Sequence, residues 1–442
     1  MHALKFILLL LTTVTVAQTK FTIKGHFNAT ANKEITLKGF TAQESFPLDK
    51  TTTDSNGNFA ITYSADYIGA ALLEITKGKK VIVLLNHENY ELQWDDMNTS
   101  KSMKFINSPE NSTFDKGLTL YQNTQEKKSG ITYLIPFYEN EPQKSSFFKT
   151  ELNQLNAVIP NYLNSLSDKT YASYYLKIRT LIADFPLSTK RYPERIPELE
   201  KQCTDLNFND QRLIHSGLYY ELLDTYVATL EHYGEKKAQH LNAGIDAILA
   251  SLKSNPDLKQ NVAEHLFNQL EKRSLFESSQ YIALAMLTDN TCQLDDKHKA
   301  LFEQYRKMGN GKTAPDISFF NEHKSSLYDL KNKYKLVVFG ASWCPKCVEE
   351  IPKLKTFYDR WVKQYNLEIV FISLDDQKKD YDNFIKDFPW ISSCDFNKWE
   401  TQAAKDYCVF GTPTMYLLDS KNTIQIKPIS AEQVNAWLQL HQ

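Results

Sequence analysis

The sequence from residue 337 to residue 352 is Val337-Val338-Phe339-Gly340-Ala341-Ser342-Trp343-Cys344-Pro345-Lys346-Cys347-Val348-Glu349-Glu350-Ile351-Pro352. It opens with the end of an apolar run, which predicts a buried strand. A Trp-Cys-x-x-Cys loop follows, and the segment after it has the periodicity of a helix. Two cysteines one helical turn apart at a strand-to-helix junction can form a disulfide and exchange it with other thiols.

The two cysteines are expected to play different parts. Cys344 would lie at the helix N-terminus, where unpaired backbone N–H groups and the helix dipole favour its thiolate, the attacking species in disulfide exchange. Cys347 falls within the first turn and should be more buried, which suits it to resolve a mixed disulfide. We therefore predict that Cys344 is the more acidic and the more exposed thiol. Lys346 would favour the thiolate modestly, or be only a solvated side chain.

A second stretch supports the first. About 70 residues further on, the sequence Val409-Phe410-Gly411-Thr412-Pro413-Thr414-Met415-Tyr416-Leu417-Leu418 predicts a turn that leads into an apolar strand. Together the two stretches resemble the thioredoxin superfamily, and more narrowly the TlpA/ResA-like thiol-disulfide oxidoreductases of bacterial envelopes. The resemblance covers roughly the last 130 residues, the usual size of one domain. The matching residues are Ala314-Pro315-Asp316, Phe339, Trp343, Cys344, Cys347, Glu350, Pro352 and Gly411-Thr412-Pro413-Thr414.

The resemblance implies a fold and a set of site residues. It implies an α/β thioredoxin-like domain in which Pro413 follows a cis peptide bond and faces the cysteine pair. Trp343, Thr412 and Pro413 would hold a partner segment. Glu350 would be catalytic, tuning the thiols and moving a proton to or from Cys347. The alternative for Glu350 is a solvated surface glutamate, which is what we expect of Glu349.

One departure from thioredoxin itself bears on the proton transfer. Thioredoxin has a buried aspartate where this sequence has Val338. Glu350 is then the nearby carboxylate that we expect to act as the proton shuttle.

Composition limits the classes of function. The chain has 442 residues, enough for about two to four domains. With 51 basic and 53 acidic residues it carries no charge pattern for nucleic acid or an anionic membrane. Six cysteines are too few for a disulfide scaffold, and the ten histidines lack ligand spacing. We expect no metal and no cofactor. The cysteine pair could otherwise be half of a zinc site or a structural disulfide, but no second pair lies at a suitable spacing.

Residues 1–17 predict a signal peptide. A short basic start precedes an apolar region, and Thr15-Val16-Ala17 fits a cleavage site before Gln18. The alternative is an uncleaved membrane anchor, but an apolar segment of about 11–12 residues is too short to span. No later stretch is long and apolar enough to span. We expect an exported, soluble protein of the periplasm or cell envelope, without stable membrane insertion after cleavage.

The rest of the chain divides into three expected domains. Residues 18–107 alternate with period two, which predicts a small antiparallel β domain, a sheet or a sandwich. Residues 108–308 predict an all-α middle domain, either a spacer or a docking or dimerisation region. Its helices are expected near 145–166, 170–184, 210–231, 236–254, 257–273, 276–288 and 296–308, punctuated by prolines such as Pro160 and Pro186. Residues 309–442 form the predicted redox domain.

One turn in the β domain has two interpretations. Asp54-Ser55-Asn56-Gly57-Asn58 predicts a hairpin turn between two strands. A calcium loop is the alternative, but the glycine is misplaced and no bidentate glutamate closes the loop.

Four further cysteines need an interpretation. Cys394 and Cys408 lie in the redox domain and could bridge each other, relay electrons, or be buried free thiols. Cys203 and Cys292 lie in the middle domain and are expected to be small buried apolar residues.

The sequence therefore predicts an exported thiol-disulfide oxidoreductase. Its expected partners are envelope proteins with disulfides or thiols, together with an electron donor or acceptor protein, and reduction is the expected direction. Reductases, oxidases and isomerases share the motif and differ in reduction potential. The alternative is an envelope binding or structural protein with an auxiliary redox domain. A thiol peroxidase is disfavoured, because Ala341 stands where a threonine is needed.

Overall fold

The computed structural model describes residues 20–441, apart from residues 29, 76–78, 100–101, 290–292 and 321–324. The predicted signal peptide and Cys292 lie outside these residues. The chain divides into two compact units. The first comprises Met1–Leu187 with Phe208–Leu222, and the second comprises Ser188–Asn207 with Leu223–Gln442. Each unit is described by itself.

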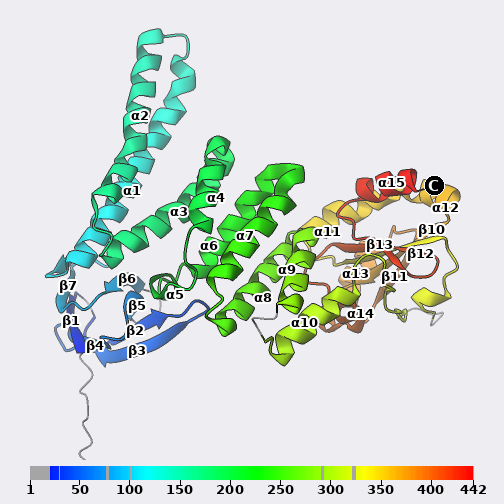
Figure 1. Ribbon diagram of the computed structural model, residues 1–442, viewed down its shortest axis with the longest axis horizontal. Coiled ribbons are helices and arrows are strands. Elements are labelled where there is room, and N and C mark those ends of the chain that lie inside the picture. Colours follow the sequence, from blue (N-terminus) through cyan, green and yellow to red (C-terminus); the bar gives the residue numbers. More distant parts are fainter. Residues whose placement is uncertain are drawn as a thin grey trace, which may run out of the picture. The chain divides into compact units, whose positions relative to one another are not determined.

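The first unit contains a sandwich of two four-stranded sheets (Figure 1). One sheet has the order β4-β1-β7-β8, with bounds Asn58–Ser64, Lys20–Phe27, Tyr90–Trp94 and Met103–Ile106. The other has the order β3-β2-β5-β6, with bounds Ser45–Thr52, Glu34–Phe40, Gly69–Ile75 and Lys79–Leu85. Neighbouring strands are antiparallel except β1 and β7, which are parallel.

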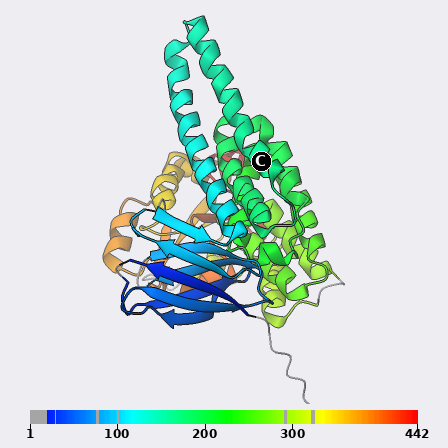
Figure 2. The same cartoon turned by 90° about the vertical axis from the view of Figure 1, so that its left-hand side faces the viewer.

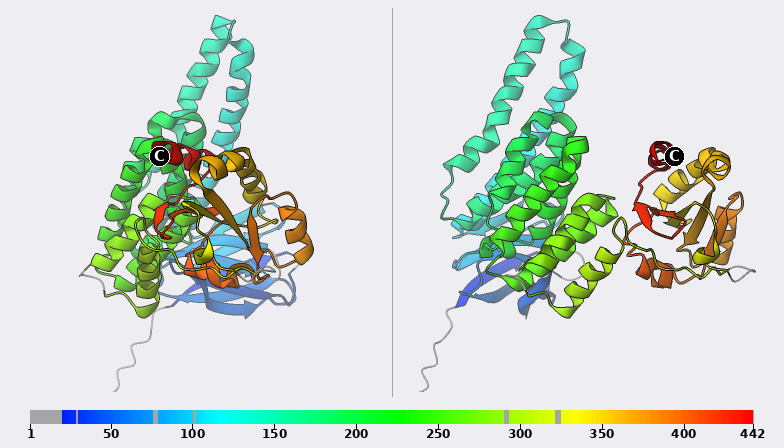
Figure 3. Two further views of the ribbon diagram at one scale, coloured as in Figure 1. Left: turned by 90° about the vertical axis from the view of Figure 1, so that its right-hand side faces the viewer. Right: turned by 45° about the vertical axis from the view of Figure 1, so that its right-hand side comes forward.

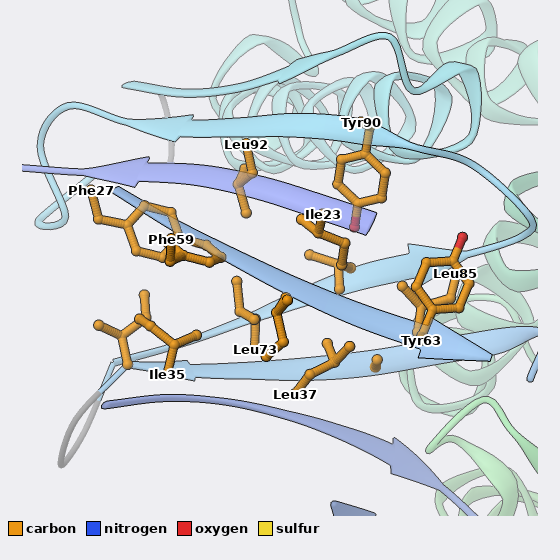
Figure 4. Packing of buried hydrophobic residues seen from close by; sticks show 14 of the residues in the cluster. Ile23, Phe27, Ile35, Leu37, Phe59, Tyr63, Leu73, Leu85, Tyr90 and Leu92 are labelled. Atoms are coloured by element: carbon orange, nitrogen blue, oxygen red, sulfur yellow. The ribbon is translucent and has the colours of Figure 1, made fainter. Parts of the chain in front are cut away.

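The period-two pattern explains this sandwich. Alternate residues of each strand point inward, so Phe27 and Phe59 of one sheet meet Ile35 and Leu73 of the other in one buried core (Figure 4). The predicted small β domain is confirmed as a sandwich.

The turn at Asp54 differs from the prediction. It joins β3 to β4, and these strands belong to different sheets, so the predicted hairpin is wrong. The Asp54 carboxylate accepts the N–H groups of Asn56 at 2.8 Å and Asn58 at 2.9 Å, and Gly57 takes a φ of 81°. The same turn chemistry closes a connection between two sheets as readily as one between paired strands.

Helices of the first unit follow the sandwich. The long helices α1 (Pro109–Leu134) and α2 (Pro142–Ser165) run side by side (Figure 2), and Ser108 caps α1 by accepting from Asn111 N. The short η2 (Ile135–Tyr138) lies between them. The helices α3 (Tyr171–Arg191) and α5 (Gln211–Ile214) follow. Pro160 lies inside α2, within the range predicted as helical, and Pro186 lies inside α3, which therefore continues past the predicted end at residue 184.

The middle region is helical, as predicted. Its remaining helices are α4 (Ile196–Thr204), α6 (Tyr219–Leu230), α7 (Lys237–Ser251), α8 (Pro256–Lys272), α9 (Phe276–Thr288) and α10 (Asp296–Lys307). The structure adds α4, which was not expected. It also divides the predicted 210–231 helix into α5 and α6, because Gly217 takes a φ of 70° between them. None of the helices among the described residues is both long and apolar enough to cross a membrane.

The C-terminal part is a mixed α/β domain (Figure 3). Its sheet has the order β11-β10-β9-β12-β13, with bounds Ile391–Cys394, Leu367–Ser373, Tyr334–Gly340, Thr414–Asp419 and Ile424–Ile426. Strands β11, β10 and β9 are parallel to one another. Strand β12 is antiparallel to both of its neighbours, β9 and β13. The helices are α11 (Pro345–Glu350), α12 (Lys355–Tyr365), α13 (Lys378–Ile385), α14 (Gln402–Asp406) and α15 (Ala431–Leu440).

The central strand of this domain is β9, every residue of which is buried. A strand that is covered on both faces has a nearly continuous run of apolar residues. The sequence from residue 337 to residue 352 opens with such a run. The Trp-Cys-x-x-Cys loop therefore lies at the carboxyl end of the central strand β9.

Candidate redox site

Cys344 lies at the N-terminus of a helix, as predicted. It is the N-cap of α11, with φ −90° and ψ 112°, and Pro345 follows as the first helical residue. Proline suits that position because its missing N–H would have no partner there. The Cys344 sulfur accepts the backbone N–H of Cys347 at 3.2 Å. A capping sulfur that receives an N–H is well placed to carry negative charge.

Cys347 is the more deeply buried thiol. Its exposed fraction is 0 %, against 7 % for Cys344, and both are free thiols in the structure. Burial raises the pKa of the Cys347 thiol, and the neighbouring Cys344 sulfur adds to the rise. Gly340 makes room behind it, because a Cβ there would lie 2.4 Å from Ile351 Cδ1 and 3.4 Å from Cys347 Sγ.

The loop before β12 faces the cysteine pair. The Thr412–Pro413 peptide bond is cis, which confirms that prediction. Cys344 Sγ lies 3.4 Å from the carbonyl oxygen of Thr412, within hydrogen-bonding distance for sulfur. Strands β9 and β12 pair with Thr414 opposite Phe339, so the residues just before Thr414 lie beside the end of β9. The register of the sheet therefore brings two stretches about 70 residues apart to one place.

Glu350 ends α11, three residues beyond Cys347. Its carboxylate lies 2.7 Å from Lys353 Nζ, and Lys353 also pairs with Glu349 at 3.2 Å. The exposed side-chain fraction is 16 % for Glu350 and 69 % for Glu349, so the two glutamates differ in environment as expected. Pro352 follows in the short η6 (Ile351–Leu354), which separates α11 from α12.

Trp343 borders the pair on its solvent side. It is 46 % exposed, and its indole N–H donates to the Leu374 carbonyl at 3.2 Å. Its ring also contacts that of Trp399, with centroids 6.1 Å apart. Lys346, between the cysteines, is exposed.

Asp375 holds the loop in front of the cysteines, and sequence reasoning missed it. Its side chain accepts the Ser342 N–H at 3.1 Å, the Ser342 hydroxyl at 2.6 Å and the Ser373 hydroxyl at 2.6 Å. The residue is 1 % exposed, so these bonds fix Ser342 against the end of β10. The available signal was the apolar run that ends shortly before it, which is typical of a buried strand.

Cys394 and Cys408 are separate, buried free thiols. Cys394 Sγ contacts the Asp375 carbonyl oxygen at 3.4 Å. Burial raises the pKa of Cys408 to about 12. Cys203 is also buried and free. Neither redox-domain thiol takes part in a disulfide in this structure.

A buried ion pair joins helix α8 to the C-terminal domain. Lys427 Nζ lies 2.6 Å from the Glu271 carboxylate, which also accepts the Tyr305 hydroxyl at 2.7 Å. Close by, the rings of Phe267 and Phe410 make an edge contact at 5.3 Å. Helix α8 thus packs against the segment that leads to Pro413.

The described residues hold no group of histidine, cysteine and carboxylate side chains that could bind a metal ion. The chemistry available at the site is that of the two thiols, the helix N-terminus and the backbone of the Thr412 loop.

Comparisons with known proteins identify the same domain. A thioredoxin-like family model matches residues 332–424. The thioredoxin-like protein YneN of Bacillus subtilis is 31% identical over 132 residues, which are 28% of this chain and 76% of YneN. The chain belongs to the thioredoxin-like family.

Further relatives match the same thioredoxin-like domain. Thiol-disulfide oxidoreductase ResA of Bacillus cereus is 28% identical over 147 residues, covering 32% of this chain and 84% of ResA. A solved thiol-disulfide oxidoreductase of Bacteroides fragilis is 30% identical and covers 30% of this chain and all of its own, with a TM-score of 0.28. The similarity lies in the C-terminal domain, which is a thiol-disulfide oxidoreductase-like domain with a closely spaced cysteine pair.

Proposed function

We propose that the protein is an exported thiol-disulfide oxidoreductase that reduces disulfides of envelope proteins through Cys344 and Cys347. One observation carries the proposal. The Cys344 sulfur caps a helix, receives the Cys347 N–H at 3.2 Å and lies 3.4 Å from the Thr412 carbonyl. A thiolate formed there is stabilised by the helix N-terminus and stands beside backbone that an extended partner can approach.

The proposed reaction has two exchange steps. The Cys344 thiolate attacks one sulfur of the partner's disulfide, and the other partner sulfur leaves as a thiolate. Cys347 then loses its proton and attacks Cys344 Sγ, which releases the second partner thiolate. Two electrons pass to the partner, and the pair ends as a disulfide that a separate thiol protein must reduce.

Each remaining site residue has a proposed part. Trp343, Thr412 and Pro413 contact the partner segment beside Cys344. Glu350 accepts the proton that Cys347 loses, directly or through water. Its position on the helix that carries Cys347 and its low exposure support this part.

Reduction is the proposed direction, and the reduction potential of the pair is the property that decides it. The pattern of residues 1–17 supports export.

The test uses the full chain with insulin as disulfide substrate and dithiothreitol as electron source. We expect rapid precipitation of reduced insulin chains, and loss of that acceleration in Cys344→Ser. Activity retained in Cys344→Ser would overturn the proposal. Equilibration with glutathione buffers tests the direction, since a pair that stays mostly reduced beside oxidised glutathione would be an oxidant.

A further inference from the structure

Two exposed tryptophans lie next to the candidate redox site. Trp343 directly precedes Cys344, and Trp399 comes from the short η7 (Lys398–Glu400) between β11 and α14. Their exposed fractions are 46 % and 41 %, and their ring centroids are 6.1 Å apart. Val348, one helical turn beyond Cys344, is also exposed, at 50 %. Large apolar side chains held in solvent together indicate an interaction site.

The segment that presents Trp399 is firmly held. The Asp395 carboxylate accepts the Asn397 N–H at 3.0 Å and the Thr401 hydroxyl at 2.8 Å. Phe396 and Lys398 take positive φ values of 60° and 53°, a conformation that costs free energy for residues other than glycine. The anchoring bonds keep the Trp399 indole at the surface.

The surroundings of Trp399 are electrically balanced. Lys398 pairs with Asp376 at 2.5 Å, and Glu400 pairs with Lys405 at 2.6 Å. Each charge next to the indole therefore has an opposite charge as its partner, so the surface offers apolar contact rather than net charge. This favours an apolar side chain of the partner.

We propose that Trp399 is a specificity-determining residue, which with Trp343 binds an apolar side chain next to the reactive cysteine of an extended partner polypeptide. The inference rests on the proposed function, because the partner's disulfide must reach Cys344. Consecutive Cα atoms lie about 3.8 Å apart. A side chain next to the attacked cysteine of the partner would therefore lie close enough to contact the indoles of Trp343 and Trp399. An indole pair offers a large and rigid contact area for such a side chain.

The probes are two synthetic peptides whose single cysteine carries 2-nitro-5-thiobenzoate in a mixed disulfide. A leucine precedes the cysteine in one peptide and a serine in the other. The Cys344 thiolate attacks the peptide sulfur, the S–S bond to the reporter breaks, and the coloured reporter thiolate leaves with the electron pair. The second-order rate constant for each peptide follows from the absorbance of the released reporter.

We expect the full-length reduced protein to prefer the leucine peptide by at least about fivefold, since leucine burial against the indoles is favourable. In Trp399→Ala the preference should fall below about twofold, and Trp399→Phe should restore part of it. Phe147→Ala removes an equally apolar ring, exposed on α2, and should keep the wild-type ratio. Because each ratio compares two peptides on one preparation, partial misfolding of a variant cancels.

Two results overturn the inference. One is a wild-type protein that reacts with both peptides at the same rate, and the other is a Trp399→Ala variant that keeps the wild-type preference. In either case reporter release still depends on Cys344, and the proposed function stands. If wild type and Cys344→Ser release the reporter equally slowly from both peptides, the proposed function fails as well.

Discussion

The sulfur of Cys344 lies 3.4 Å from the carbonyl oxygen of Thr412, although the two residues are far apart in the sequence. Cys344 is the N-cap of α11, which follows the central strand β9, and Thr412 lies in the loop before β12, which pairs with β9. The contact places the Cys344 thiol against the half-buried backbone of the Thr412 loop. Such a site is suited to a disulfide that arrives on a polypeptide.

The two thiols should differ in their reactivity with pH. Burial raises the pKa of Cys347, so below the ordinary cysteine value of about 8.5 that thiol stays protonated. Iodoacetamide at pH 7 should therefore label Cys344 at least about tenfold faster than Cys347, and labelling of Cys347 should approach its full rate only near its raised pKa of about 12. Peptide mass spectrometry of the reduced protein measures both rates. Equal rates at pH 7 would contradict the assignment of roles.

Glu350 and Glu349 form a matched pair of test positions. A carboxylate near Cys347 opposes a second negative charge and can take its proton. Glu350→Gln should therefore lower the pKa of Cys347 and slow disulfide exchange at pH 7 several-fold. Glu349→Gln should have little effect, because its side chain is 69 % exposed. If both variants give the same alkylation profile against pH, Glu350 has no special part.

Asp375 should act as a positioning residue through Ser342. Asp375→Ala removes the acceptor of the half-buried Ser342 N–H and hydroxyl and of the buried Ser373 hydroxyl, and a buried group left unpaired costs roughly 1–3 kcal/mol. We expect a lower free energy of unfolding in urea and exchange at Cys344 slowed by about tenfold. Asp375→Asn retains one acceptor oxygen and should recover part of the exchange rate. A destabilised Asp375→Ala with a wild-type exchange rate would show a merely structural role.

Gly340 should not tolerate a side chain. In Gly340→Ala the new methyl group would lie 2.4 Å from Ile351 Cδ1. Overpacking of this kind costs about 1–3 kcal/mol, and the denaturation midpoint should fall accordingly. Gly130→Ala is the control, because a Cβ at that position in α1 meets nothing within 4 Å. It should be neutral or stabilise the helix by up to about 1 kcal/mol. Adding Ile351→Val to Gly340→Ala should restore part of the loss.

Removing one charge of the Glu271–Lys427 ion pair should lower the free energy of unfolding more than removing both charges. Burial lowers the pKa of Lys427, while the Glu271 carboxylate opposes that shift. Glu271→Gln leaves a buried cation without its counter-charge, which costs about 3–5 kcal/mol. The double variant Glu271→Gln/Lys427→Met removes both charges and should recover at least about half of that loss. Urea denaturation measures each value, and a single variant as stable as the wild type would contradict the prediction.

Local chemistry explains which parts of the site could be predicted. The apolar run, the Trp-Cys-Pro-Lys-Cys sequence and the Gly-Thr-Pro turn each place their residues on a strand end, a helix N-terminus or a turn. Side-chain caps are equally local: Ser108 accepts from Asn111 N at the start of α1, and Ser430 accepts from Gln433 N at the start of α15.

The missed residues depend on contacts between distant elements. Asp375 meets Ser342 only because β10 lies parallel to β9, so that the ends of the two strands lie side by side. Trp399 reaches Trp343 because Phe396 and Lys398 take left-handed conformations, which neither residue type signals. Asp54 joins two sheets where its local sequence suggested a hairpin, because turn residues do not specify which strands pair.

The ion pair between Glu271 and Lys427 also makes two positions dependent on each other in evolution. A lysine at position 427 is tolerable in a buried setting only while helix α8 supplies a carboxylate. Relatives that carry the redox domain without the helical region lose the groups that cover Lys427, namely Glu271, Phe276 and Tyr305, so the matching position should be free to vary. Where the helix is kept, the two positions should change together, and their joint substitution would trace when the helical region and the redox domain became one inherited unit.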